Sequence, residues 1–94
     1  MSARIVLAVE LADLGEWSPC ELRSEYDPEE STIRLNRRAI ARLAPERRLG
    51  FVLRCIAHEL YHALEHHGRI KRIRANARRE AAADAFAQRV AGAL

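Results

Sequence analysis

The stretch of sequence that decides the fold is ERRLGFVLRCIAHELYHALEH, which covers residues 46–66. Its apolar residues recur every three or four positions, which is the period of a helix with one buried face. They are Leu49, Val52, Leu53, Ile56, Leu60, Ala63 and Leu64. Pro45 comes just before the stretch, where proline favours a first helical turn, and Gly68 follows where a C-terminal cap belongs. The pattern predicts one long helix over residues 46–66.

Three short segments before this helix are typical of strands. Residues 4–9 are apolar and partly β-branched. Residues 21–26 and 32–35 alternate apolar and polar side chains, and the turn-rich residues 27–31 separate them, which indicates a hairpin. Asn36 is a candidate N-cap for a short helix at residues 37–43. We therefore predict a small antiparallel sheet of about three strands.

A second helix is predicted over the alanine-rich residues 80–94. Its apolar stripe consists of Ala83, Phe86, Val90 and Leu94, which recur at helical spacing. Strands followed by helices predict the α+β class. We expect the sheet to pack on the long helix and the second helix to pack beside it.

Length and composition favour one folded domain over residues 1–94. The chain has 49% hydrophobic and 31% charged residues, which suits a globular protein rather than a disordered one. Four Gly, three Pro and two Cys exclude a collagen-like chain and a disulfide scaffold. The apolar run at residues 5–9 is too short to span a membrane. We therefore expect a soluble cytoplasmic protein without a membrane partner.

Charge is distributed unevenly along the chain. Residues 1–33 hold two Arg and eight Asp or Glu, whereas residues 34–94 hold fourteen Arg or Lys and five Asp or Glu. The arginine-rich run at residues 69–79 would form a cationic surface able to contact phosphates. Aromatic residues make up only 5% of the chain, and no nucleic-acid-binding motif accompanies the run. A basic module for nucleic-acid or protein interaction is therefore an alternative function, and nucleic acid is not the expected main partner.

The long helix contains residues with metal-ligand spacing. His58 and His62 stand four positions apart, so their imidazoles lie on one helix face, one turn apart. Two such imidazoles can bind a single Zn2+ at ~2.0–2.1 Å. Glu59 lies about 100° round the helix, where it can reach a water at that ion and act as general base. The alternative interpretation of this HExxH arrangement is an ordinary histidine-bearing helix surface.

A catalytic zinc site needs a third protein ligand. His66 is a further turn along, and three ligands on one straight helix would spread over ~12 Å. The third histidine of the longer HExxHxxGxxH motif would fall at Gly68, which excludes that class. Glu80 and Asp84 are the candidates on the second helix, in an otherwise apolar surface. Acids buried there need partners, and a metal and a metal-bound histidine are such partners.

The composite pattern His58-Glu59-x-x-His62 followed by Glu80-x-x-x-Asp84 resembles the HExxH and ExxxD signature of the gluzincin zinc metallopeptidases, especially the small minigluzincin-like members. The segments IAHEL (residues 56–60) and DAFA (residues 84–87) are similar to helix motifs of the ImmA/IrrE-like peptidases, and the likeness extends over residues 27–90. This resemblance implies a zincin-like fold, with Glu80 as the third zinc ligand. It also implies that Asp84 accepts a hydrogen bond from the non-ligating nitrogen of His58, as metal-bound histidines commonly require.

The same resemblance implies a function. We expect zinc-dependent hydrolysis of peptide bonds in an intracellular protein or peptide, with Glu59 as general base on a zinc-bound water. Analogy with the ImmA/IrrE-like group suggests a transcriptional repressor as target. A zinc-binding domain with weak or no activity is the alternative, in which the metal mainly supports a thin core.

The chain departs from the family pattern at two points. Tyr61 stands where those enzymes commonly have a small residue. No His or Tyr follows Asp84, although larger gluzincins stabilise the oxyanion with such a residue. Oxyanion stabilisation or substrate contact would then fall to zinc, to Tyr26, to Tyr61 or to an arginine.

Other predictions concern substrate binding and the remaining reactive side chains. Residues 32–35 form either the sheet edge on which an extended peptide adds or an interior strand. We expect Cys55 to be a buried thiol, and His66 and His67 to cap the helix or face solvent. Trp17 is expected in the core or as a lid, and a disulfide between Cys20 and Cys55 is not expected in a cytoplasmic chain.

Overall fold

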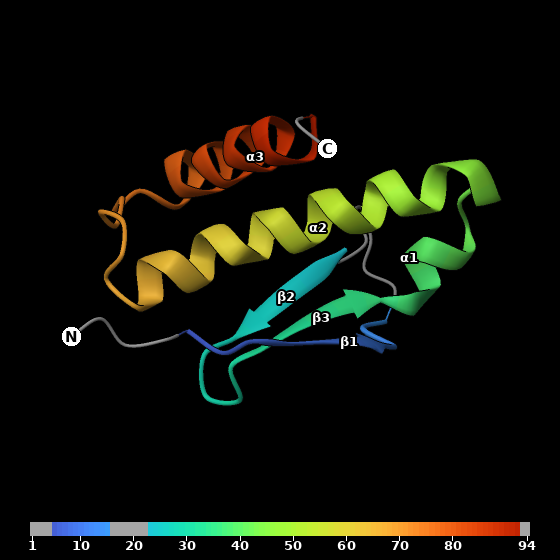
Figure 1. Cartoon of the computed structure of the whole chain (residues 1–94), viewed down its shortest axis with the longest axis horizontal. Coiled ribbons are helices and arrows are strands. Elements are labelled where there is room, and N and C mark those ends of the chain that lie inside the picture. The colour runs from blue at the N-terminus through green and yellow to red at the C-terminus, as the bar shows by residue number, and fades with distance from the viewer. Residues whose placement is uncertain (1–4, 16–22, 93–94) are drawn as a thin grey trace.

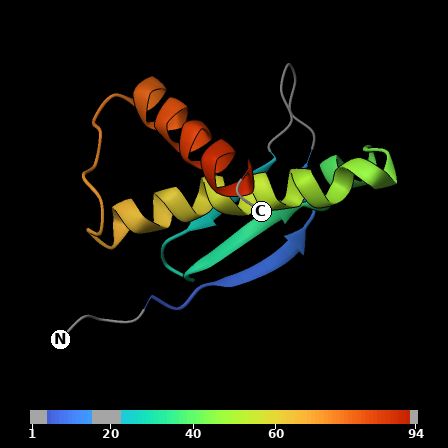
Figure 2. The ribbon, with the colours of Figure 1, turned by 45° about the horizontal axis from the view of Figure 1, so that its top comes forward.

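The computed structural model describes residues 5–15 and 23–92. Within these residues it contains three strands and three helices, which confirms the α+β class. The elements are β1 (Ala8–Ala12), β2 (Ser24–Asp27), β3 (Thr32–Asn36), α1 (Arg37–Ala41), α2 (Pro45–His66) and α3 (Asn76–Gly92). Figure 1 shows three layers, in which α2 lies across one face of the sheet and α3 packs on the other side of α2. Figure 2 shows that α3 crosses α2 obliquely.

The sheet is mixed, so the prediction of an antiparallel sheet is wrong. The strand order is β1-β3-β2. β2 and β3 form the predicted antiparallel hairpin, whereas β1 pairs with β3 in the parallel direction. Alternation along a strand specifies which face each side chain occupies, but it carries no information on strand order or direction.

The first strand lies further along the chain than the predicted residues 4–9. Ala8 pairs with Thr32 and Ala12 pairs with Asn36, so the five residues of β3 set the length of β1. Val9 and Leu11 are 49% and 60% exposed because this edge of the sheet extends beyond the cover of α2. Pairing with β3, rather than burial, therefore determines where β1 begins and ends.

The second hairpin strand, β3, is the central strand of the sheet. Ile33 and Leu35 are almost fully buried and pack with Cys55 of α2. The interior-strand interpretation of residues 32–35 is therefore correct and the edge interpretation is wrong. The strand that ends the sheet on the side of the candidate site is β2.

Asn36 terminates β3 and starts α1, as the sequence predicts. Its side chain accepts a hydrogen bond from the backbone N–H of Arg38, and it also accepts from Leu14 and donates to the carbonyl of Gly15. The residue is completely buried. One amide side chain therefore caps the helix and anchors the segment that follows β1.

α2 spans almost the range that its apolar period predicts. It begins with Pro45 in the first turn and ends at His66. Gly68 has φ +69°, and the N–H groups of Gly68 and Arg69 donate to the carbonyls of Glu65 and Leu64. This left-handed glycine cap stops the helix. Cys55 is 6% exposed, so the prediction of a buried thiol is confirmed.

α3 starts at Asn76, before the predicted residue 80. Ala83 and Ala87 are 0% and 4% exposed, and these small side chains let α3 lie close to α2. The rings of Phe86 and Tyr61 meet at a centroid distance of 5.7 Å. The earlier start places Arg79 and Glu80 inside the helix, where their positions are fixed by its backbone.

No helix among the described residues combines the length and the apolar character that crossing a membrane requires.

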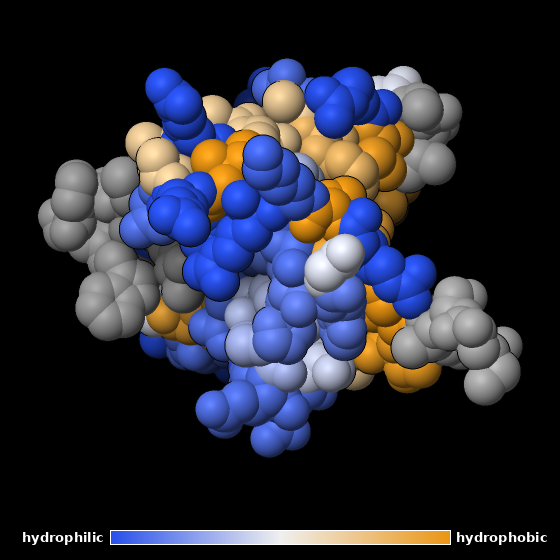
Figure 3. All heavy atoms as spheres, turned by 90° about the vertical axis from the view of Figure 1, so that its left-hand side faces the viewer, coloured by the Kyte–Doolittle hydropathy of each residue, from blue (hydrophilic) through white to orange (hydrophobic). Residues whose placement is uncertain are grey.

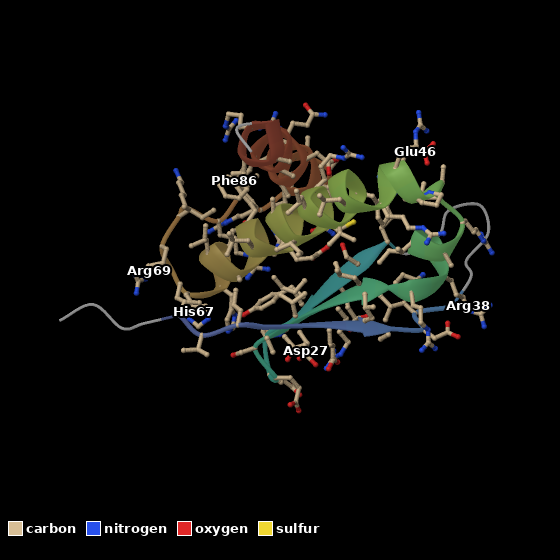
Figure 4. All side chains as sticks on the ribbon, turned by 45° about the vertical axis from the view of Figure 1, so that its right-hand side comes forward. Asp27, Arg38, Glu46, His67, Arg69 and Phe86 are labelled. Atoms are coloured by element: carbon tan, nitrogen blue, oxygen red, sulfur yellow. The ribbon has the colours of Figure 1, made fainter. Side chains whose placement is uncertain are left out.

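Some predictions fall on Trp17, Cys20 and Leu94, which lie outside the described residues. His66 and His67 are exposed, as expected, and Figure 4 shows His67 and Arg69 where α2 ends.

Candidate metal centre

His58 and His62 bring their Nε2 atoms together on one face of α2. The two nitrogens are 3.3 Å apart, and the ring centroids are 5.0 Å apart at an interplanar angle of 70°. The helix itself produces this approach, because residues four apart lie one above the other. Two ligands at ~2.0–2.1 Å from one tetrahedral zinc would be separated by about 3.3–3.4 Å. The spacing of the two imidazoles therefore suits a shared ion.

Glu80 reaches this pair from α3. Its Oε2 lies 2.9 Å from Nε2 of His58, and its Oε1 lies 3.3 Å from Nε2 of His62. The Glu80 side chain is 58% exposed, whereas the two histidine side chains are 19% and 13% exposed. The carboxylate thus closes one side of the pair and borders solvent, which leaves an approach for water or substrate.

Asp84 holds the other nitrogen of His58. Its Oδ1 lies 2.8 Å from Nδ1 of His58, so the carboxylate accepts the Nδ1 hydrogen. The two residues lie on different helices, and the contact orients the imidazole ring from α3. The structure thus places Asp84 at the position that the sequence pattern implies for it.

Glu65 holds Nδ1 of His62 in the same way, at 3.0 Å. The Glu65 side chain is 2% exposed and also accepts from Nε and one terminal nitrogen of Arg79, each at 3.3 Å. Burial acts to raise the pKa of Glu65, but the hydrogen bonds from Arg79 and His62 outweigh it and hold the pKa below its ordinary value. Sequence reasoning missed Glu65, although its spacing of three from His62 was a usable signal.

The hydrogen bonds to the two Nδ1 atoms determine which atoms of the centre are left to bind an ion. With Nδ1 of each histidine donating to a carboxylate, Nε2 of each neutral ring carries a lone pair. Both lone pairs face the Glu80 carboxylate, and three acceptors cannot hydrogen-bond to one another. A metal ion between the three groups would accept all of these lone pairs at once. Imidazole nitrogens with a carboxylate oxygen are a donor set that Zn2+ commonly takes.

Glu59 lies beside the pair and is 5% exposed. Ser24 of β2 donates a hydrogen bond of 2.6 Å to its Oε2, whereas Oε1 has no hydrogen-bond partner among the described residues. Burial raises the pKa of Glu59 above its ordinary value of 4.5, while the Ser24 hydrogen bond and the neighbouring imidazoles act to lower it. Sequence reasoning missed Ser24, because the contact joins residues 35 positions apart.

Two cavities border Glu59. A cavity of about 290 Å3 includes Ser24, Cys55 and His58 in its lining, and one of about 340 Å3 includes Tyr26, His62 and Glu80. Glu59 lines both of them. Space for a substrate is therefore available beside the carboxylate, between β2 and α3.

The two tyrosines considered for oxyanion stabilisation occupy different surroundings. Tyr26 lines the larger of these cavities, and its hydroxyl is buried without a hydrogen-bond partner among the described residues. Burial raises the pKa of that hydroxyl. Tyr61 is 9% exposed and packs against Phe86 and the edge of His62, outside the lining of both cavities. Tyr26 is therefore better placed than Tyr61 to donate a hydrogen bond toward the site.

Among the described residues, ligand atoms of His58, Glu59 and His62 lie within 4.8 Å of one another, an arrangement that could hold a metal ion. Comparison of the chain with protein-family models, with curated proteins and with solved structures gives no match. The functional argument therefore depends on the geometry of this centre and on the sequence motif.

Proposed function

We propose that the protein is a zinc-dependent metallopeptidase that hydrolyses peptide bonds in a protein or peptide. The observation that carries this proposal is the convergence of the Nε2 atoms of His58 and His62 on the Glu80 carboxylate, beside the buried Glu59. The resemblance of the motif to gluzincin and ImmA/IrrE-like peptidases supports the same function. His58, His62 and Glu80 would hold the zinc ion, with Asp84 and Glu65 fixing the two imidazoles.

When bound, zinc would polarise the scissile carbonyl and lower the pKa of water at the site toward ~7. Glu59 is the base for that water, because its Oε2 is held by Ser24 and its Oε1 remains to accept a proton. Glu59 then delivers the proton to the nitrogen of the leaving amine.

The position of β2 supports an extended peptide as substrate. β2 is an edge strand, so within residues 5–15 and 23–92 no strand pairs with the backbone groups on its outer side. A peptide in extended conformation can pair with such an edge and lie along the two cavities beside Glu59. Tyr26, which lines one of these cavities, would supply its unpaired hydroxyl to the developing oxyanion.

Cleavage of a mixed peptide library by the zinc-loaded protein tests this function. We expect cleavage that a chelator removes and that added zinc restores. Glu59→Gln should abolish turnover while zinc stays bound. Glu29→Gln changes an exposed carboxylate of the hairpin turn that lies outside the described lining of both cavities, and it should leave turnover unchanged. Equal turnover by wild type and Glu59→Gln would contradict the proposal.

One observation favours a second candidate, a zinc-binding domain without appreciable activity. The helix α3 joins α2 through small alanines and through the acid contacts of Glu80 and Asp84, so a bound ion would tie the two helices together. In that case zinc raises the thermal stability of the protein but no peptide is cleaved. Stability and turnover measured on the same zinc-loaded sample separate the two candidates.

The arginine-rich segment is the basis of the remaining alternative, a basic interaction module. Arg69, Lys71, Arg72 and Arg74 are exposed between α2 and α3, and Figure 3 shows hydrophilic residues gathered at this end of the molecule. Binding through such a surface would fall steeply with salt and would not respond to a chelator. A salt titration of binding to duplex DNA, with and without chelator, distinguishes it from the zinc centre.

A further inference from the structure

The smaller of the two cavities beside Glu59 combines an apolar floor with a cationic rim. Phe51, Cys55 and Ala87 contribute apolar surface, and Arg23 and Arg54 contribute guanidinium groups. The two arginines lie far apart in the sequence: Arg23 directly precedes β2, and Arg54 belongs to α2. The volume of about 290 Å3 is at the lower end of the range typical of ligand sites.

Neither guanidinium is engaged by a carboxylate of the described residues. Other arginines form ion pairs: Arg34 contacts Glu10, Glu25 and Asp27, and Arg79 contacts Glu65. Arg23 and Arg54 are exposed and form no such ion pair within residues 5–15 and 23–92. Their charge is therefore available to a ligand.

The charges of the two arginines also act on the Cys55 thiol, which lines the same cavity. Burial raises the pKa of the Cys55 thiol, and the charge of Glu59 acts in the same direction. The Ser24 hydrogen bond and the charges of Arg23 and Arg54 act to lower that pKa. Asp84 is the one carboxylate besides Glu59 in the described lining, and it is engaged by His58 at 2.8 Å. Among the described residues, the lining therefore offers two cations without an ion pair and no unpaired anion other than the proposed base.

We propose that this cavity binds an acidic side chain of the peptide substrate, next to the bond that is cleaved. Glutamate fits better than aspartate, because its methylene groups can lie on Phe51 and Ala87 while its carboxylate accepts hydrogen bonds from Arg54 and Arg23. The inference rests on the proposed peptidase function and specifies its substrate class. Glu59 and His58 line the same cavity, so the distance between the bound acidic side chain and the scissile bond is fixed. The inference therefore predicts a preference for glutamate at a single position of the substrate peptide.

Capture by an inactive protein tests this preference without requiring turnover. The probe is a mixed peptide library in which each peptide occurs with glutamate and with glutamine at one position, and the bait is immobilised, zinc-loaded Glu59→Gln. Mass spectrometry of the captured peptides gives the glutamate-to-glutamine ratio directly. We expect glutamate forms to be enriched about fivefold at one position, the size of one exposed ion pair.

The same capture with Arg54→Gln or Arg23→Gln added should bring the ratio close to one. Arg89→Gln, which removes an exposed arginine outside the cavity lining, should leave the enrichment unchanged and so controls for general attraction to a basic protein. Equal capture of both forms, no capture of either, or loss of enrichment in Arg89→Gln as well would overturn the inference. Cleavage by wild type is measured separately, so failure of the peptidase function and failure of the acidic preference give different results.

Discussion

The Oε1 atom of Glu65 lies 3.0 Å from Nδ1 of His62, and the Glu65 side chain is only 2% exposed. Each imidazole of the centre is therefore oriented by a carboxylate, His62 from within α2 and His58 by Asp84 of α3. A buried carboxylate needs compensation, and Arg79 supplies it from α3. The two helices thus share one polar network that runs from Arg79 to the Nε2 atoms of the histidines.

Replacing Glu65 tests the importance of this network. Glu65→Gln keeps the shape of the side chain but removes the charge that orients His62 and pairs with Arg79. We expect zinc affinity to fall by about 10- to 100-fold, as is typical for loss of such outer partners. Competition titration against a chromophoric chelator measures the affinity, with Glu29→Gln as control. Unchanged affinity in Glu65→Gln would show that Glu65 does not support the centre.

Ser24 tests how Glu59 is held. Ser24→Ala removes the 2.6 Å hydrogen bond to Oε2 of Glu59, so the carboxylate loses its fixed orientation. We expect kcat to fall by about tenfold while zinc binding stays as in wild type, because the described hydrogen bonds of the imidazoles do not include Ser24. Steady-state kinetics and zinc content on the same preparation give both values. A fall in zinc content equal to the fall in kcat would contradict an orienting role.

The open face of the sheet predicts a pH dependence of stability. A hydrogen bond from Arg34 holds the pKa of Asp27 below its ordinary value of 3.8. A carboxylate whose pKa is depressed by folding stabilises the folded state above its unfolded pKa, and this stabilisation is lost as pH falls through the lowered folded pKa. Arg34→Gln should therefore be less stable than wild type at pH 6, and the difference should shrink as the pH falls from about 4 to 2.

Urea denaturation at a series of pH values measures that difference. Arg78→Gln, which removes an exposed arginine without a carboxylate contact among the described residues, is the control and should track wild type at every pH. If the difference in the free energy of unfolding between Arg34→Gln and wild type stays constant down to pH 2, the ion pair between Asp27 and Arg34 does not stabilise the fold.

The packing of α3 on α2 depends on the small size of Ala83, which is fully buried. Ala83→Leu must push the helices apart or strain the side chain, so we expect a loss of about 1–3 kcal/mol in the free energy of unfolding. Ala85→Leu, on the exposed side of the same helix, should change it by less than about 0.5 kcal/mol. Chemical denaturation of the metal-free protein compares the two. Equal stability of both variants would contradict the close contact.

Local patterns were sufficient to predict the bounds of α2. The three- to four-residue apolar period of α2, Pro45 at its start and the φ of +69° at Gly68 are all properties of a short stretch of chain. The direction of β1 was not accessible in this way, because strand alternation is the same in parallel and antiparallel pairs. The start of α3 was missed because the apolar stripe that predicts this helix begins only at Ala83, after the charged residues Arg78, Arg79 and Glu80.

The sequence also indicated some residues of the candidate site and missed others. The relation of His58, Glu59 and His62 follows from helix geometry alone, and the contacts of Glu80 and Asp84 depend on α3 lying against α2. Ser24 and Arg79 could not be predicted, because their contacts to Glu59 and Glu65 exist only once the sheet, α2 and α3 have packed. Such cross-element partners leave no periodic signal in the sequence.

Zinc binding by wild type and by Glu80→Ala tests the central claim most directly. Calorimetric titration of the metal-free proteins should give one zinc per wild-type chain, and an affinity at least about 100-fold lower for Glu80→Ala, with Glu29→Ala behaving as wild type. Wild type that binds no zinc, or Glu80→Ala that binds it as tightly as wild type, would contradict a centre formed by His58, His62 and Glu80.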